Sequence, residues 1–189
     1  MNALKQLGTA ARFLLLATLV LGIGYPLVSF GVGEVIAKHQ TQGSIVTSHG
    51  QVIGSGLIGQ EFAGAQWFHS RPSNAGKGYD PLSSGATNAG PNDATLTSTI
   101  SARKAAVAKE EGVALSAVPA DAITASASGL DPDISMAYAE LQAKRVAANN
   151  NLTLEQVMAR IKTASHHRLL GFLGEDTVNV LKLNASLKG

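Results

Sequence analysis

The chain has 189 residues, a formal net charge of +2 at pH 7 and a mean hydropathy of +0.13. Lys5 and Arg12 alone account for the excess, because the other Lys and Arg residues equal the 13 acidic residues in number. This near-neutral remainder argues against a nucleic-acid-binding protein, which needs a clustered basic face. Cysteine is absent, which excludes disulfides, thiolate metal sites and a cysteine nucleophile.

The first predicted element is a transmembrane helix over residues 13–33, which carry no charged side chain. At 1.5 Å per residue this run is roughly 30 Å long, about one hydrocarbon thickness. A cleaved signal peptide would have a shorter apolar region of about 7 to 15 residues, so we predict an anchor that is retained. Since Lys5 and Arg12 precede the run, the positive-inside tendency predicts that residues 1–12 are cytoplasmic and residues 34–189 form a periplasmic domain.

A helical extension and a hairpin are predicted directly after the anchor. Residues 34–42 can form a short helix that Gly43 ends. Residues 44–47 and 52–53 read as two strands joined by a tight turn. A third strand is predicted over residues 66–68, where Gln, Trp and Phe follow one another.

A long loop is predicted over residues 71–92. This stretch is rich in Gly, Pro, Ser and Asn, which favour turns over regular elements. Loops longer than about 12 to 15 residues in compact domains are usually functional or disordered. The loop is therefore a candidate interaction segment.

Three helices are predicted in the carboxy-terminal half. Asn92 or Asp93 can cap a helix over residues 94–112. Asp131-Pro132 has the form of an N-cap followed by proline at the first helical position, and predicts a helix from that point. Thr153-Leu154-Glu155-Gln156 is a capping box for a helix that ends near residue 165.

The closing segment, residues 177–183, can be an extended strand or a short helix. Few strands among several helices indicate the α+β class. We therefore predict one N-terminal transmembrane helix followed by a single mixed α/β extracytoplasmic domain.

No catalytic constellation is apparent. Residues 54–59 match the G-x-G-x-x-G pattern, but they lie in a predicted hairpin and do not open a helix, so we interpret the glycines as allowing a bulge or close backbone packing. There is no G-x-S-x-G elbow for a serine nucleophile. The five histidines lack metal-ligand spacing and are predicted to be solvated; they are His39, His49, His69, His166 and His167.

Residues 121–135 are the most polar candidate site. Four hydroxyl residues lie near the carboxylates Asp121 and Asp131; they are Thr124, Ser126, Ser128 and Ser135. Oxygen ligands of this kind can hold a cation, and they can equally hydrogen-bond to the loop of a partner protein. The residues alone leave both interpretations open.

Several motifs in this order resemble the C-subunit (KdpC) family of the Kdp potassium-transporting ATPases. The resemblance covers essentially the whole chain after a single N-terminal anchor. The motifs are residues 54–60 (GSGLIGQ), 68–73 (FHSRPS), 79–81 (YDP), 84–91 (SGATNAGP), 125–132 (ASASGLDP) and 178–184 (VNVLKLN).

The resemblance implies a non-catalytic accessory subunit in a bacterial inner-membrane complex for high-affinity potassium uptake. Its partners would be a channel-like subunit and a P-type ATPase subunit that carries catalysis, and the complex would use ATP, Mg²⁺ and K⁺ without a cofactor bound to this chain. The candidate residues for a partner interface or polar pocket are Arg71, Tyr79, Asp80, Ser84, Asn88, Ser126, Ser128 and Asp131. The candidates for close packing of the anchor against another helix are Gly22, Gly24 and Gly33.

Two accessory roles are compatible with this resemblance. The family is described as raising the affinity of the pump subunit for ATP, but the predicted topology puts the domain on the other side of the membrane from cytosolic ATP. We therefore expect the domain to stabilise the complex and to shape the outer entry for potassium. The alternative from a different class is an anchored periplasmic enzyme or ligand-binding domain unrelated to transport.

Overall fold

The computed structural model describes residues 3–188 and separates into two compact units, residues 1–45 and residues 46–189. Each unit is described by itself. The first unit is mostly one long helix, and the second is a mixed α/β domain with its own hydrophobic core.

The first unit contains a helix from Ala3 to Ile36 that is long and apolar enough to cross a membrane. It consists of α1 (Ala3–Ala17), a π-helical segment (Thr18–Gly24) and α2 (Tyr25–Ile36). The widened segment directly precedes Pro26, which has no backbone N–H and whose ring crowds the preceding turn. A short helix, α3 (Lys38–Thr41), follows a break at Ala37 and confirms the predicted helical extension.

The predicted hairpin is formed by β1 (Ile45–Ser48) and β2 (Gln51–Ser55), which belong to the second unit from Val46 onward. His49 and Gly50 form its turn with φ values of 50° and 76°, the left-handed pair that a two-residue hairpin requires. The hairpin prediction is therefore confirmed.

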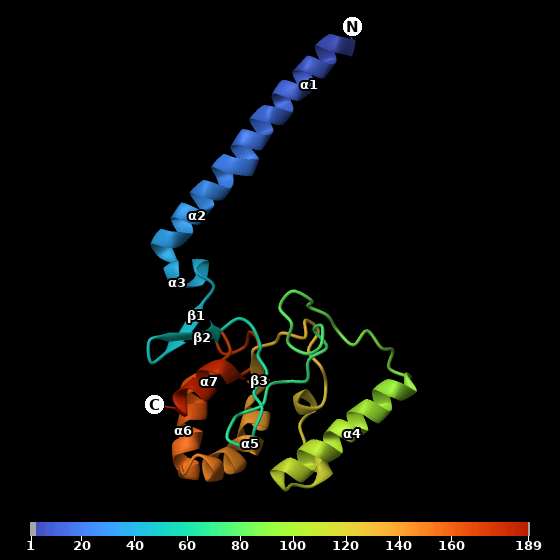
Figure 1. Ribbon diagram of the computed structural model, residues 1–189, viewed down its shortest axis with the longest axis vertical. Helices are drawn as coiled ribbons and strands as arrows, with labels where there is room; N and C mark the ends of the chain where they lie inside the picture. Colours follow the sequence, from blue (N-terminus) through green and yellow to red (C-terminus); the bar gives the residue numbers. More distant parts are fainter. Residues whose placement is uncertain (1–2, 189) are drawn as a thin grey trace. The chain divides into compact units, whose positions relative to one another are not determined.

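A second, three-stranded antiparallel sheet has the order β3-β5-β4, with β3 (Asp133–Ser135), β4 (Ser165–His166) and β5 (Thr177–Asn179). Four helices accompany it: α4 (Ala94–Glu111), α5 (Met136–Asn149), α6 (Leu154–Ala164) and α7 (Val180–Ser186). Two 3₁₀ turns, Leu115–Ala117 and Ala120–Ala122, connect α4 to the second sheet. In Figure 1, α5 lies between α4 and the α6–α7 pair.

The core lies between the second sheet and the helices packed on it. Its largest fully buried apolar side chains come from five elements and one loop: Phe68, Ile134, Val146, Val157, Ile161, Val178, Val180 and Leu183. This small core buries apolar surface from distant parts of the chain and fixes the position of the long loops.

Two helix predictions are confirmed together with their caps. Asp93 accepts hydrogen bonds from the backbone N–H groups of Thr95 and Leu96 at the start of α4. Thr153 and Gln156 form the reciprocal capping box at the start of α6. Local side-chain chemistry therefore decided where these helices begin.

The predicted helix start at Asp131-Pro132 is wrong. Residues 133–135 form β3 instead, and α5 begins at Met136 with Ser135 as its N-cap. The Ser135 N–H and hydroxyl both donate to the carboxylate of Asp121, at 2.7 and 3.0 Å. Pairing of β3 with β5 and this contact override the local helix signal.

The predicted strand over residues 66–68 is also wrong, because Gln66 lies in a turn and Trp67 in a bend, and the segment pairs with no strand. Two side-chain amides take the place of a neighbouring strand. Asn184 bonds the N–H and C=O of Phe68, both at 2.9 Å, and Gln142 bonds those of His69 at 2.7 and 3.2 Å. The closing segment 177–183 contains both predicted forms, β5 followed by α7.

Candidate functional site

The long loop 71–92 crosses the polar segment 121–135 within the second unit, and we call this the loop crossing. The guanidinium of Arg71 forms an ion pair with Asp131 at 2.9 Å and lies 3.5 Å from the carbonyl oxygen of Thr124. The Tyr79 hydroxyl donates to the Arg71 carbonyl at 2.5 Å. The structure thus brings two predicted site residues of the long loop, Arg71 and Tyr79, together with Asp131, which is 60 residues after Arg71 in sequence.

Ser73 is the residue of the loop crossing that sequence reasoning missed as a site. Its hydroxyl donates to the Gly129 carbonyl at 2.6 Å and accepts from the N–H groups of Ala75 and Tyr79 at 3.1 and 2.9 Å. Gly129 has φ of 68°, and a Cβ there would lie 2.7 Å from the backbone nitrogen of Ala75. The only sequence signal was the quoted Arg-Pro-Ser motif.

Three of the predicted serines also join the loop crossing. The Ser84 hydroxyl donates to the Ser128 carbonyl at 2.8 Å, and the Ser128 hydroxyl accepts from the Leu130 N–H at 3.0 Å. Ser126 is buried, and its N–H donates to the Pro72 carbonyl at 3.4 Å. These serines hold the two segments against each other.

Asp80 and Asn88 do not take part in these contacts among residues 3–188. The Asp80 carboxylate accepts from the Leu82 N–H at 2.9 Å and so stabilises its own turn. Asn88 is exposed and has φ of 52°, a backbone conformation that asparagine tolerates. The predicted set of site residues is thus larger than the group that the structure assembles.

Of the glycines in residues 54–59, Gly59 packs closely against backbone, as predicted, whereas a Cβ on Gly54 would meet the Gln60 side chain. The Gly59 N–H donates to the Leu130 carbonyl at 2.8 Å, and a Cβ on Gly59 would lie 2.4 Å from the Asp131 carbonyl oxygen. This contact fixes residues 130–131 of the loop crossing to the segment that follows the hairpin.

The Tyr79 hydroxyl at the centre of the loop crossing is partly buried, which disfavours its ionised form. Desolvation, assisted by the nearby Glu61 carboxylate, raises the pKa of Tyr79 to about 12. Tyr79 therefore remains a neutral hydrogen-bond donor to Arg71 throughout the physiological range.

A cavity of about 190 Å³ lies beside the loop crossing and is lined by six charged residues: Arg71, Asp121, Asp131, Asp133, Glu175 and Asp176. Four of these carboxylates already accept internal hydrogen bonds: Asp121 from Ser135, Asp131 from Asp133, Asp133 from Thr177 and Asn179, and Asp176 from Arg168. The Thr124 hydroxyl is likewise used, since it donates to the Ala120 carbonyl at 2.8 Å. Within the described residues 3–188, no three His, Asp or Glu side chains form a group that could hold a metal ion.

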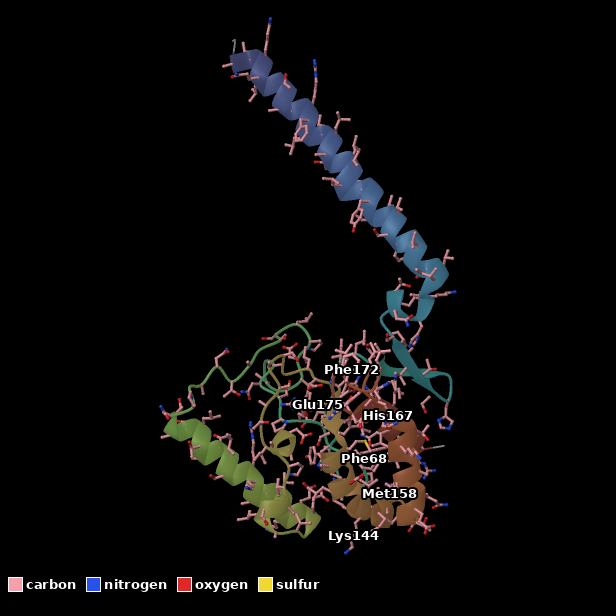
Figure 2. All side chains as sticks on the ribbon, turned by 180° about the vertical axis from the view of Figure 1, so that it is seen from behind. Phe68, Lys144, Met158, His167, Phe172 and Glu175 are labelled. Atoms are coloured by element: carbon pink, nitrogen blue, oxygen red, sulfur yellow. The ribbon has the colours of Figure 1, made fainter. Side chains whose placement is uncertain are left out.

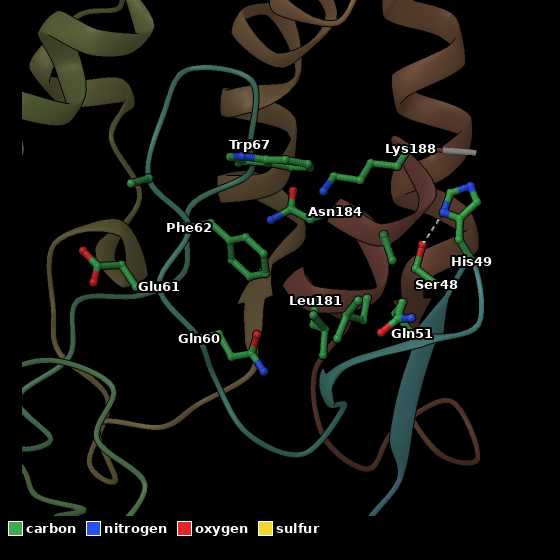
Figure 3. Close-up of a pocket in the computed structure, with 13 residues that line it drawn as sticks. Ser48, His49, Gln51, Gln60, Glu61, Phe62, Trp67, Leu181, Asn184 and Lys188 are labelled. Carbon is green, nitrogen blue, oxygen red and sulfur yellow. Dashed lines mark hydrogen bonds between the residues drawn. The ribbon is translucent and has the colours of Figure 1, made fainter.

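A larger pocket of about 500 Å³ lies between the β1–β2 hairpin, the segment around Trp67 and α7 (Figure 3). The rings of Phe62 and Trp67 are 6.3 Å apart and tilted by 48°, and the Lys188 ammonium lies 4.8 Å from the centre of the Trp67 ring. In Figure 3 the Glu61 side chain points away from Phe62 and Trp67. The pocket has the size of a small-molecule site, and sequence reasoning did not predict it.

One histidine differs from the predicted solvated state. The His69 side chain is only 24% exposed and lies 3.6 Å from Glu110, with its other ring nitrogen 3.2 Å from the Gly64 carbonyl oxygen. It joins the loop around Trp67 to the end of α4. His167, by contrast, is exposed and lies 3.4 Å from Asp176.

The three anchor glycines differ from one another. A Cβ on Gly22 or Gly24 would meet its nearest atoms at 3.6 or 3.4 Å, which are ordinary contacts. A Cβ on Gly33 would lie 2.5 Å from a carbon of Thr41, whose hydroxyl donates to Glu34 at 2.8 Å. Gly33 thus allows α3 to fold back on α2, an intrachain contact that the sequence did not reveal.

Comparisons with known proteins agree on one family. The family model described as KdpC, K⁺-transporting ATPase, c chain, matches residues 7–189. A Kineococcus radiotolerans protein named potassium-transporting ATPase KdpC subunit is 49% identical over 99% of this chain and 95% of its own length. Proteins of the same name from Mycobacterium tuberculosis and Acidobacterium capsulatum are each 46% identical over 97% of this chain, covering 97% and 98% of their lengths. This chain therefore belongs to the KdpC family of potassium-transporting ATPase subunits.

Proposed function

We propose that this chain is a non-catalytic accessory subunit of an ATP-driven, high-affinity potassium uptake complex. The observation that carries the proposal is the joining of one membrane-spanning helix to a separately packed domain in a chain of the KdpC family. Catalysis and ion selection then belong to partners, a P-type ATPase subunit and a channel-like subunit. The ATP and Mg²⁺ that the complex uses act at those partners.

In this proposal the chain spans the inner membrane once, with residues 1–12 in the cytoplasm and the domain in the periplasm. Lys5 and Arg12 support this orientation, because they precede the apolar run and Glu34 is the first charge after it. The domain then acts at the outer side of the complex, where it stabilises assembly and shapes the entry of potassium. Any effect on the ATP affinity of the pump subunit would be transmitted through the anchor helix.

The loop crossing supports a structural role for its motifs. Arg71 and Ser73 hydrogen-bond to Asp131 and Gly129, and the Tyr79 hydroxyl donates to the Arg71 carbonyl. Such a crossing gives the domain a rigid outer surface without a reactive group, which suits a subunit that positions other subunits.

Deletion of residues 1–33 tests the proposal. The deletion should release the domain from the membrane and abolish both recovery of the partner subunits with this chain and potassium uptake at low external potassium. The full-length chain, expressed with the same partners, is the control. A fully active complex without any tethered copy of this chain would overturn the proposal.

A further inference from the structure

Residues 168–174, which we call the apolar turn, present large hydrophobic side chains to solvent. Leu169, Leu170, Phe172 and Leu173 are 68%, 76%, 70% and 49% exposed. Figure 2 shows where Phe172 lies on the domain, together with His167 and Glu175 on either side of the turn in sequence. Single exposed apolar residues are ordinary, but four large ones in one turn indicate an interaction surface.

The apolar turn is preformed. Leu169 and Leu173 exchange two backbone hydrogen bonds of 2.9 and 3.0 Å, and Gly171 at the tip has φ of 79°. At the base, the Asp176 carboxylate accepts from the Arg168 N–H at 3.0 Å and lies 3.4 Å from the His167 ring. A binding partner would therefore meet an ordered projection, which lowers the entropy cost of association.

The charges at the base favour a protein over a lipid surface. Arg168 precedes the apolar residues, and the exposed acidic residues Glu175 and Asp176 follow them. Anionic lipid headgroups would repel the acidic side, and the turn lacks the Trp and Tyr side chains that favour a membrane interface. An apolar centre with a rim of both charge signs is typical of protein interfaces.

The surface continues beyond the turn. A groove of about 420 Å³ lies between α5 and α6, and His167, next to the apolar turn, lines it. Met136 and Met158 contribute partly buried thioethers to the same groove, with Glu140 and Lys162 at its margins. Flexible methionine side chains adapt well to a partner surface.

We propose that the apolar turn docks into an apolar socket on the outer surface of another subunit of the same potassium-transporting ATPase. The inference rests on the proposed function, which supplies the partner. A small contact is sufficient, because both subunits are held in the same membrane and their surfaces therefore meet at a high effective concentration. Leu170 and Phe172, the two most exposed side chains of the turn, enter the socket most deeply.

Photocrosslinking in the complete complex tests the location of the contact. A benzophenone amino acid replaces Phe172 in one variant and Leu115 in the control, since Leu115 is 54% exposed on a turn outside the candidate interface residues. We expect crosslinks from position 172 to another subunit of the ATPase, with several-fold lower yield from position 115. Crosslinks from position 172 only to lipid, only to a second copy of this chain, or to nothing would overturn the proposal.

Substitution tests how much the apolar turn contributes to binding of the partner subunit. The double variant Leu170→Ser/Phe172→Ser should lower recovery of the partner subunits about tenfold after detergent extraction, whereas Leu115→Ser leaves it unchanged. An unaltered thermal unfolding curve will show that the variant domain is folded. Unchanged recovery with the double variant would overturn the docking proposal, while failure of the wild-type chain to recover any partner would instead overturn the proposed function.

Discussion

Asn184 on α7 binds both backbone polar groups of Phe68, at a separation of 116 residues in sequence. Its side-chain oxygen accepts from the Phe68 N–H and its side-chain nitrogen donates to the Phe68 carbonyl, both at 2.9 Å. Both residues are essentially buried. The Asn184 amide therefore supplies the two hydrogen bonds that a neighbouring strand would make, and it holds the segment around Trp67 against the core.

Replacing Asn184 with leucine should destabilise the domain strongly. The change leaves two buried backbone groups without partners, each costing about 1–3 kcal/mol. We therefore expect the free energy of unfolding to fall by roughly 2–5 kcal/mol, measured by urea unfolding of the detergent-solubilised chain. Asn92→Ala, at an exposed position, is the control and should change it by less than about 0.5 kcal/mol. Equal stability of the two variants would contradict the account.

Gly59→Ala should loosen the loop crossing. The added methyl group would overlap the backbone of Leu130 and Asp131, which must then shift. Overpacking of this kind costs about 1–3 kcal/mol. Gly90→Ala is the matched control, because a Cβ there has no neighbour within 4 Å. Limited proteolysis at residues 71–92 should be faster in Gly59→Ala than in Gly90→Ala, and the same rate in both would refute the close approach.

Glu111 and Arg145 form a buried ion pair of 2.9 Å that joins α4 to α5. The side chain of Glu111 is 2% exposed, and its second carboxylate oxygen has no hydrogen-bond partner among residues 3–188. Burial raises the pKa of Glu111 above its ordinary value of 4.5, although Arg145 opposes the change. The folded state thus holds this proton to a higher pH than the unfolded state.

This raised pKa predicts a specific pH dependence. As pH rises from the unfolded value to the folded value, the unfolded state releases the proton first, so the contribution of Glu111 to stability falls. The unfolding free energy of the wild type minus that of Glu111→Gln should therefore be larger at pH 4 than at pH 7, because glutamine does not titrate. Glu110→Gln, whose parent side chain is 40% exposed, is the control. A difference that grows toward pH 7 would contradict the assignment.

Bulky residues at Gly22 should weaken assembly of the complex. Small residues let membrane helices approach closely, so Gly22→Leu is expected to reduce recovery of the partner subunits several-fold. Gly8→Leu, before the predicted span, is the control. Gly33→Leu is a poor probe, because it would also displace Thr41 within this chain. Full recovery with Gly22→Leu would remove this glycine from the predicted packing surface.

The elements that sequence patterns predicted correctly are those with local signals. Asp93 lies directly before α4, and the Thr153–Gln156 box lies within one helical turn of α6. The hairpin is similar, since its turn residues are adjacent to both strands. Each signal acts over a few residues, which makes it readable without knowledge of the fold.

The errors arose where distant residues decided the structure. Asp121 binds Ser135 and moves the helix start away from Asp131, and Asn184 replaces a strand partner at Phe68. For the loop crossing, composition indicated the two polar segments, but it did not predict that Arg71 pairs with Asp131 or that Ser73 joins them. These pairings depend on tertiary contacts that no local pattern encodes.

The most direct test of the account is the side of the membrane on which the domain lies. The chain has no cysteine, so Leu82→Cys and Gln6→Cys each introduce a single label site, at positions that are exposed. We expect a membrane-impermeant maleimide added to cells with a permeabilised outer membrane to label position 82 and not position 6 until the inner membrane is opened. Labelling of position 6 with protection of position 82 would contradict a periplasmic accessory subunit.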